Sequence, residues 1–234
     1  MKTTRTKTTH KRINTGHLIV HLILLAGIAV VVFPFLWMLL TSFKTTGESL
    51  KIPPTFFPEK WTPEAYKTIT SSTIPFGTVY LNTILSAVIT TVVQIVFCSM
   101  AGYAFARIEF PFKNFIFVLL LSVLMVPGQI FLLPQYQLIQ KMGLLNTIPA
   151  LFLPNLFSAF GTFLLRQFFM SMPQELEDAA IVDGCNRFQI FGRIMVPLIQ
   201  PGIAALTIFT FKFAWNDFMW PLIVNNSMDK LILG

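Results

Sequence analysis

The chain has 234 residues, of which 54% are hydrophobic and 12% are charged. Soluble domains carry about 25% charged residues, so this composition argues against a water-soluble fold and indicates a protein that crosses a membrane several times. The net charge of +7 does not indicate nucleic-acid binding, because five of the 17 basic residues gather in the first twelve positions with no aromatic residue between them.

This basic cluster precedes the first long apolar stretch. We expect residues 1–16 to form a cytosolic tail and residues 17–43 to form the first span, because basic residues before a span hold that end on the cytosolic side. A cleaved signal peptide does not fit, because its apolar core is only about 7 to 15 residues long. The N-terminus is therefore predicted to be cytosolic.

Four more apolar stretches are long enough to cross a bilayer, which takes about 20 residues in a helix. They cover residues 79–105, 114–134, 147–169 and 197–224. The sequence therefore predicts an all-α, polytopic membrane helix bundle with five spans. We expect residues 44–78 and 225–234 to be extracytoplasmic, 79–224 to form the core with spans two to five, and 170–196 to be a cytosolic loop within it. Prolines and glycines interrupt several spans, either as ordinary kinks or as hinges.

The cytosolic loop is the most polar part of the predicted core. Its stretch "QELEDAAIVDGCNRFQIFGRIMVP", residues 174–197, holds four of the ten acidic residues, namely Glu175, Glu177, Asp178 and Asp183. Ser171 with Gln174 predicts a capping box that opens a helix running to about Asp183. Gly184 suits the position after its end.

A second helix is expected to follow at once. Asn186 with Gln189 predicts another capping box, and Pro197 is expected to end or kink the helix at the membrane. On the first helix, Ala179, Ala180 and Asp183 follow Leu176 at helical spacing, which predicts a surface that another protein can approach closely. Anionic lipid headgroups would repel the acidic residues beside it, so a protein partner is the better prediction.

The spacing of this loop resembles the EAA loop of ABC-transporter permeases, whose pattern is E-A-A, three residues, G, nine residues, and I-x-L-P. Here the pattern is Asp178-Ala179-Ala180, three residues, Gly184, nine residues, and Ile194-Met195-Val196-Pro197. Asp replaces the leading Glu, and Val replaces the Leu before the proline. Glu177 is expected to substitute for Asp178 if the shorter side chain of Asp178 does not reach its partner.

Flanking stretches are similar to carbohydrate-uptake permeases of the maltose and multiple-sugar type, and most similar to the smaller of the two permease subunits. The stretches are "YAFARIEFPFKN" (103–114), "GLLNTIPALFLP" (143–154), "FGTFLLRQFFMSMPQELEDAA" (160–180) and "WNDFMWPLIV" (215–224). The resemblance implies the type I ABC importer permease fold in a bacterial plasma (inner) membrane. Family members usually have six spans, so five spans imply an end that is truncated after residue 234.

The resemblance also implies a division of labour. A second permease subunit completes a heterodimer, two ATP-binding subunits bind ATP and Mg, and an extracytoplasmic solute-binding protein delivers a sugar. This chain lacks the G-x-x-x-x-G-K-[ST] phosphate loop, so we expect a transport subunit with no cofactor and no catalytic residues rather than an enzyme. The residues that the resemblance assigns to ATPase coupling are Glu177, Asp178, Ala179, Ala180, Gly184, Arg187, Ile194 and Pro197.

Polar residues at the fifth span are candidates for the translocation path. Lys212, Trp215, Asn216 and Asp217 cluster there, with Asn82 and Asn155 as further candidates in other spans. An ionisable residue inside a span marks a functional pathway by default, and sugars bind polar groups beside aromatic rings. The alternative is structural anchoring, with Trp215 in an aromatic belt at the interface. Cys98 and Cys185 fall in different predicted environments, so neither a disulfide nor a metal site is expected.

Three other functional classes stay open from sequence alone. An ABC importer permease for a non-sugar solute would share the spacing of the EAA loop, although the flanking stretches favour sugar. An integral membrane enzyme would need a reactive cluster at one depth, whereas all three histidines lie near the N-terminus. A channel would not need a cytosolic docking loop.

Overall fold

The computed structural model describes residues 15–71 and 75–233, which form helices and no strands. The all-α prediction is therefore confirmed for these residues. They fall into two units that divide between residues 73 and 74. The predicted cytosolic tail, residues 1–16, lies outside the described residues except for its last two positions.

The first unit contains the first predicted span. Helix α1 (Thr15–Ser42) is apolar on every side, and its stretch Ile19–Ser42 is long and apolar enough to cross a membrane. This agrees with the predicted span at 17–43. Two short helices follow, α2 (Thr46–Ser49) and α3 (Glu64–Ser71).

Glu48 organises the polar segment that follows α1. Its Oε1 accepts hydrogen bonds from the backbone N–H of Glu59 and the hydroxyl of Thr55, both at 2.8 Å. The hydrogen bond from the Glu59 N–H lowers the pKa of Glu48, because it stabilises the charged carboxylate. Lys44 donates to the carbonyl of Thr55, and its ammonium lies 4.8 Å from the centre of the Trp37 ring. Residues 50–63, which have no regular secondary structure, are thus held in one conformation by side-chain contacts.

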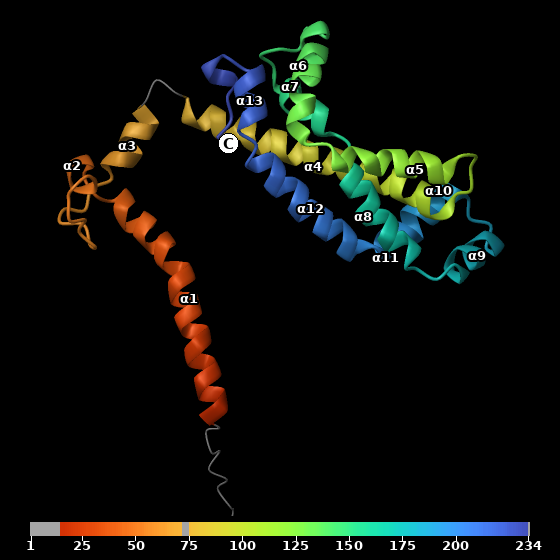
Figure 1. Cartoon of the computed structure of the whole chain (residues 1–234), viewed down its shortest axis with the longest axis horizontal. Coiled ribbons are helices and arrows are strands. Elements are labelled where there is room, and N and C mark those ends of the chain that lie inside the picture. Colours follow the sequence, from red (N-terminus) through yellow and green to blue (C-terminus); the bar gives the residue numbers. More distant parts are fainter. Residues whose placement is uncertain (1–14, 72–74, 234) are drawn as a thin grey trace, which may run out of the picture. The chain divides into compact units, whose positions relative to one another are not determined.

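Helix α4 (Phe76–Arg107) is the central element of the second unit. Figure 1 shows α8 (Ala159–Met170) and α12 (Gln200–Trp215) lying along it. Its 32 residues contain no proline, so it runs unbroken for about 48 Å at 1.5 Å per residue. Its buried face carries small and polar side chains, namely Asn82, Thr83, Ser86, Ala87, Thr90, Thr91, Gln94, Cys98, Ser99 and Gly102. Small residues let membrane helices approach closely, and polar ones bond across the contact.

The third predicted span, 114–134, is interrupted by a sharp bend. Helix α5 (Lys113–Ser122) and the 3-10 turn η1 (Val123–Met125) end before Pro127. The chain resumes as η2 (Gly128–Phe131) and α6 (Leu132–Lys141), bent by 99° from the first part. Proline disfavours helical backbone at the residue before it, and Val126 is extended.

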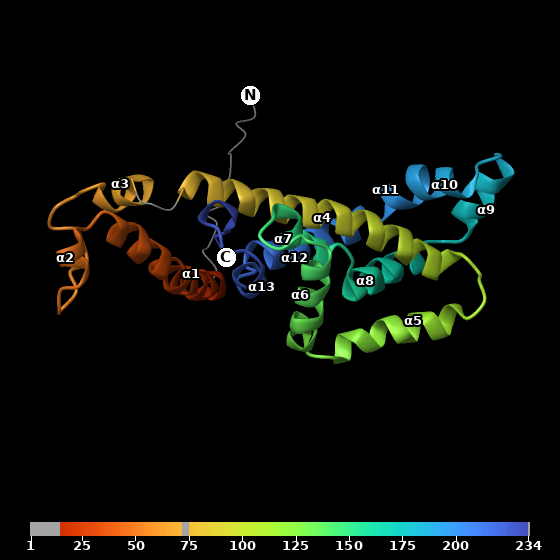
Figure 2. The same ribbon diagram turned by 90° about the horizontal axis from the view of Figure 1, so that it is seen from above.

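Two further predicted spans are broken as well. In 147–169, α7 (Ile148–Phe152) and η3 (Leu153–Asn155) are bent by 49° from α8. In 197–224, α12 ends at Trp215 and α13 (Met219–Val224) begins after a short break. Among the described residues, two helices can each cross a membrane alone, and up to five spans result if each bent pair is one span. Figure 2 shows α6 turning away from the direction of α5.

Close packing between α8 and α12 generates a stability prediction. A Cβ added at Gly202 of α12 would lie 2.5 Å from Cδ2 of Phe168, whereas a Cβ added at Gly192 would meet no atom within 4 Å. We expect Gly202→Ala to destabilise the folded chain by about 1–3 kcal/mol through overpacking. Gly192→Ala is the matched control and should be neutral or slightly stabilising. Thermal unfolding in detergent measures both, and equal unfolding temperatures would contradict the packing argument.

Candidate coupling segment and transport pocket

The predicted cytosolic loop forms four short elements in succession. They are α9 (Glu175–Val182), α10 (Arg187–Gln189), the π-helix η4 (Ile190–Met195) and α11 (Val196–Leu198). Figures 1 and 2 both place α9 and α10 at the end of the second unit where α4 and α8 finish. We call residues 175–198 the coupling segment.

The predicted start of its first helix is wrong in one detail. Ser171 with Gln174 forms no capping box: Gln174 occupies the N-cap of α9 without a side-chain hydrogen bond. Ser171 instead ends α8, where its hydroxyl donates to the carbonyl of Phe168 at 2.7 Å. Ser171 therefore belongs to the end of α8, although its spacing from Gln174 predicts that it begins α9.

The turn between α9 and α10 agrees with the prediction. Gly184 has φ +81°, which an L side chain rarely adopts. The N–H of Gly184 donates to the carbonyl of Ile181, and the N–H of Cys185 donates to that of Ala180, as in a Schellman motif. The predicted capping box between Asn186 and Gln189 is present, with both hydrogen bonds at 2.9 Å.

Pro197 does not end the second helix. The chain stays helical through Pro197 to Leu198, and the bend of 77° falls at Ile199, before α12. Ile194 is partly buried against the core, Met195 is fully buried, and Pro197 is exposed. The motif residues 194–197 therefore attach the coupling segment to the helix bundle.

Helix α9 divides the predicted coupling residues between two faces. Asp178 and Ala179 are exposed, whereas Glu177 and Ala180 are buried. The predicted surface of small residues around Leu176 is thus split, because Ala180 packs inward. The exposed side instead carries large apolar side chains on α9 and α10: Ile181, Val182 and Phe188 are 47%, 87% and 82% exposed. We call Asp178, Ala179, Ile181, Val182 and Phe188 the outer face.

Glu177 is engaged within the chain. Its side chain is 4% exposed, and its Oε1 lies 3.1 Å from Nε of Arg107. These two atoms form an ion pair without the alignment of a hydrogen bond. Oε2 lies 3.3 Å from Nη1 of Arg187 and accepts the hydroxyl of Tyr103 at 3.3 Å. The expectation that Glu177 substitutes for Asp178 at a partner does not fit this inward position.

Two arginines join the ends of α4 and α8 reciprocally. Arg107, the last residue of α4, donates from Nη2 to the carbonyls of Phe169 (2.8 Å) and Met172 at the end of α8. Arg166 of α8 donates from Nε to the carbonyl of Phe105 near the end of α4, at 3.1 Å. The last carbonyls of a helix lack intrahelical partners and attract cations. We call Arg107, Arg166 and Glu177 the arginine clasp.

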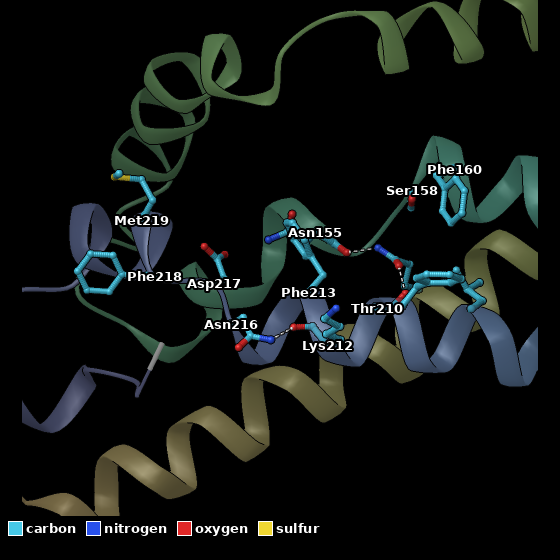
Figure 3. Close-up of a pocket in the computed structure, with 13 residues that line it drawn as sticks. Asn155, Ser158, Phe160, Thr210, Lys212, Phe213, Asn216, Asp217, Phe218 and Met219 are labelled. Atoms are coloured by element: carbon cyan, nitrogen blue, oxygen red, sulfur yellow. Dashed lines mark hydrogen bonds between the residues drawn. The ribbon is translucent and has the colours of Figure 1, made fainter. Parts of the chain in front are cut away.

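A pocket of about 960 Å³ lies beside α12 and the break between η3 and α8 (Figure 3). Four of the predicted path residues line it, namely Asn155, Lys212, Asn216 and Asp217. Phenyl rings supply much of the remaining wall, from Phe160, Phe209, Phe213 and Phe218. The arrangement provides amide, ammonium and carboxylate groups beside aromatic surface.

Two predicted path residues lie elsewhere. Asn82 is buried and donates to the carbonyls of Asp229 (2.8 Å) and Leu231 (3.1 Å), which holds the last described segment against α4. Trp215 lines a smaller hollow of about 370 Å³ with Lys212 and Asn216, and its ring packs against Tyr80. The structure thus gives Asn82 a packing role.

The sequence analysis missed the most buried polar contact of the pocket wall. Thr210 donates its hydroxyl to Oε1 of Gln94 at 2.5 Å, and Nε2 of Gln94 donates to the carbonyl of Asn155 at 2.8 Å. This chain of bonds joins α4, α12 and η3. The signal for this contact in the sequence was a glutamine in the middle of a predicted span, where an amide without a hydrogen-bond partner is costly.

The structure is that of a multi-pass helical membrane protein with a polar pocket and a polar segment at one end. The family model of binding-protein-dependent transport system inner membrane components matches residues 98–233, which include the coupling segment and all of the residues that line the pocket except Gln94. The chain belongs to this family, whose members are transporter permease subunits.

Curated relatives of known name cover most of this chain. The arabinooligosaccharides transport system permease protein AraQ of Halalkalibacterium halodurans is 37% identical over 206 residues, which are 87% of this chain and 74% of AraQ. The diacetylchitobiose uptake system permease protein NgcG of Streptomyces coelicolor is 35% identical over 91% of this chain and 70% of its own length. The sn-glycerol-3-phosphate transport system permease protein UgpE of Rhizobium meliloti is 33% identical over 94% and 80%.

A solved structure has the same fold. It is a bacterial ABC transporter involved in the import of the acidic polysaccharide alginate, with a TM-score of 0.82 over 98% of this chain and 80% of that chain. At 21% identity this likeness shows the fold, and it confirms the predicted type I importer permease fold.

The turn at Gly184 generates a matched pair of variants. Open space surrounds the position of a Cβ at Gly184, so the cost of a substitution comes from its φ of +81° rather than from a clash. We expect Gly184→Ala to destabilise the turn by about 1–2 kcal/mol, since a left-handed backbone is costly for alanine. Gly184→Asn should cost less, because asparagine tolerates this conformation. Limited proteolysis at residues 182–186 in detergent measures the turn, and equal cleavage of both variants and the wild type would contradict the role of φ.

Proposed function

We propose that this chain is one of two permease subunits of an ATP-driven importer that moves a sugar or oligosaccharide into a bacterial cell by alternating access. The observation that carries the proposal is the outer face of the coupling segment. This segment lies at one end of a chain of the permease family, and the pocket lies beside α12, the helix that follows the segment. Two ATP-binding subunits would hydrolyse ATP, and an extracytoplasmic binding protein would deliver the solute.

The outer face supports docking of an ATP-binding subunit. Val182 and Phe188 are more than four-fifths exposed, and Val182 lies one helical turn after the charged Asp178. Large apolar side chains grouped on a polar segment are typical of a protein interface. With the basic tail at residues 1–16 on the cytosolic side, this segment faces the cytosol, where ATP is available.

The pocket and the relatives support a carbohydrate as the solute. Amide and hydroxyl groups of Asn155, Ser158 and Thr210 stand beside phenyl rings, which suits the polar edges and apolar faces of a sugar. AraQ and NgcG are named for arabinooligosaccharides and diacetylchitobiose. The second candidate is a phosphorylated polyol: UgpE is named for sn-glycerol-3-phosphate, and Lys212 would suit a phosphate.

Docking is tested at the outer face. We expect Phe188→Ala to reduce co-purification of the ATP-binding subunits by about 30-fold, because an aromatic anchor at an interface contributes about 2 kcal/mol. Phe57→Ala removes another exposed ring, from the first unit, and is the control, expected to leave co-purification unchanged. The exposed position of Phe188 predicts no change in thermal stability of the chain. Full retention of ATP-binding subunits by Phe188→Ala would contradict docking at this face.

The solute is tested by uptake of labelled arabinooligosaccharide, diacetylchitobiose and sn-glycerol-3-phosphate into proteoliposomes that contain the full transporter. We expect uptake of a carbohydrate, with KM raised about tenfold in Lys212→Gln, since a hydrogen bond to a charged group contributes about 1.5–3 kcal/mol. Lys141→Gln, outside the pocket, is the control. Uptake of sn-glycerol-3-phosphate alone would contradict the sugar assignment, and an unchanged KM would remove Lys212 from the path.

A further inference from the structure

We propose that Glu177 is a positioning residue that fixes the coupling segment to the ends of α4 and α8, so that the three move as one body. The inference rests on the proposed coupling function and names the residues that transmit the motion. Glu177 would act through Arg107 and Arg187, without contacting the ATP-binding subunit itself.

Burial makes the ion pair between Glu177 and Arg107 demanding in its geometry. The two side chains are 4% and 10% exposed, and their charged atoms are 3.1 Å apart. Removing one partner from such a pair leaves a buried charge without compensation, which is far more costly than losing a surface pair. A displacement of α9 away from α4 would also separate the two buried charges, so the ion pair opposes such a displacement.

Apolar packing under α9 cannot supply this constraint by itself. The rings of Tyr103, Phe169 and Phe191 pack together from α4, α8 and η4, with centroids 5.3–6.3 Å apart. Apolar attraction is non-directional and permits sliding. The Tyr103 hydroxyl instead donates a directional hydrogen bond to Glu177, and the Arg107 guanidinium attracts the same carboxylate at 3.1 Å, so the carboxylate sets the position of α9 along α4.

The link between α8 and α9 is held by the same arginine. Only residues 171–174 separate the two helices, and Arg107 binds the carbonyls of Phe169 and Met172 on either side of the start of this link. Arg107 therefore contacts α8, the link and α9 at once. Without the carboxylate, α9 would stay tethered through the link but would be free to tilt.

Arg187 joins α10 to α9 across the turn at Gly184, so that α10 belongs to the same rigid body. Its guanidinium comes from α10 and meets Glu177 of α9 at 3.3 Å, and its side chain is 56% exposed. The turn is thus closed by a bond between the two short helices as well as by its own backbone. These contacts make the turn at Gly184 a fixed corner.

Transport coupling tests the proposal in the complete transporter. We expect Glu177→Gln and Arg107→Gln each to keep the ATP-binding subunits bound while uptake of the transported solute per ATP hydrolysed falls about fivefold or more, as expected when coupling between two sites is lost. The double variant should be no worse than either single variant, because the two residues act as one pair. Glu175→Gln changes an exposed carboxylate on the same helix and is the control, with an unchanged ratio. An unchanged ratio in Glu177→Gln would overturn the proposal.

A distance measurement covers the case in which the clasp variants fail to fold. Spin labels are placed at Val88 on α4 and Asp183 at the end of α9, both exposed, after replacement of Cys98 and Cys185. We expect one narrow label-to-label distance that is the same without nucleotide and after trapping with ATP and vanadate. In Arg187→Gln, which opens only the exposed side of the network, the distribution should broaden. A distance that changes on trapping in the otherwise wild-type transporter would overturn the proposal.

The results separate this proposal from the proposed function. A wild-type transporter that binds no ATP-binding subunit contradicts the importer. A wild-type transporter that works while Glu177→Gln matches it contradicts only the role of Glu177.

Discussion

Close approach of α4, α8 and α12 is the constraint on which the second unit depends. A Cβ added at Gly102 would lie 3.0 Å from the backbone nitrogen of Arg166, and one added at Gly161 would lie 2.9 Å from Sγ of Cys98. Lipid tails are as apolar as leucine, so helices in a bilayer associate through close packing of small residues rather than through burial of apolar surface. The short separation also places Arg107 and Arg166 within reach of the last carbonyls of the neighbouring helix. The clasp at Glu177 is thus a consequence of glycines in the helix contact.

The breaks in the helices follow a second constraint, which is that a backbone group inside a bilayer needs a partner. The carbonyl of Asn155, freed where η3 ends, accepts the amide of Gln94, and the carbonyl of Lys212 accepts the side-chain amide of Asn216. The indole N–H of Trp220 donates to the carbonyl of Ala150 at 2.8 Å. Asn216, a predicted path residue, thus bonds to the backbone at a helix end, as Gln94 and Trp220 also do, and the pocket forms where these breaks lie.

Sequence patterns predicted the parts of this fold that depend on interactions between residues close together in the sequence. The long helices α1 and α4 were predicted to within a few residues, since apolar length alone defines them. The turn at Gly184 and the capping box at Asn186 followed from residues three to five positions apart. Prolines and glycines in the spans predicted kinks or hinges, but the bends of 99° and 77° could not be predicted in size or direction, because hydropathy measures only the length of a span. The inward position of Glu177 could not be predicted, because its partner Arg107 lies 70 positions away and Glu177 is one of three acidic residues on the same short helix.

Helix α4 meets each functional region at a different point along its length. Asn82 near its start holds carbonyls of the segment 229–231, Gln94 near its middle stands in the pocket wall, and Arg107 at its end belongs to the clasp. Because α4 contains no break, a displacement imposed at its end reaches Gln94 without being absorbed on the way. The facing walls of the pocket are different, since Asn155 and Asn216 both stand at the ends of broken helices. A pocket with one continuous wall and two interrupted walls changes shape when the continuous wall moves, which is the property that alternating access requires.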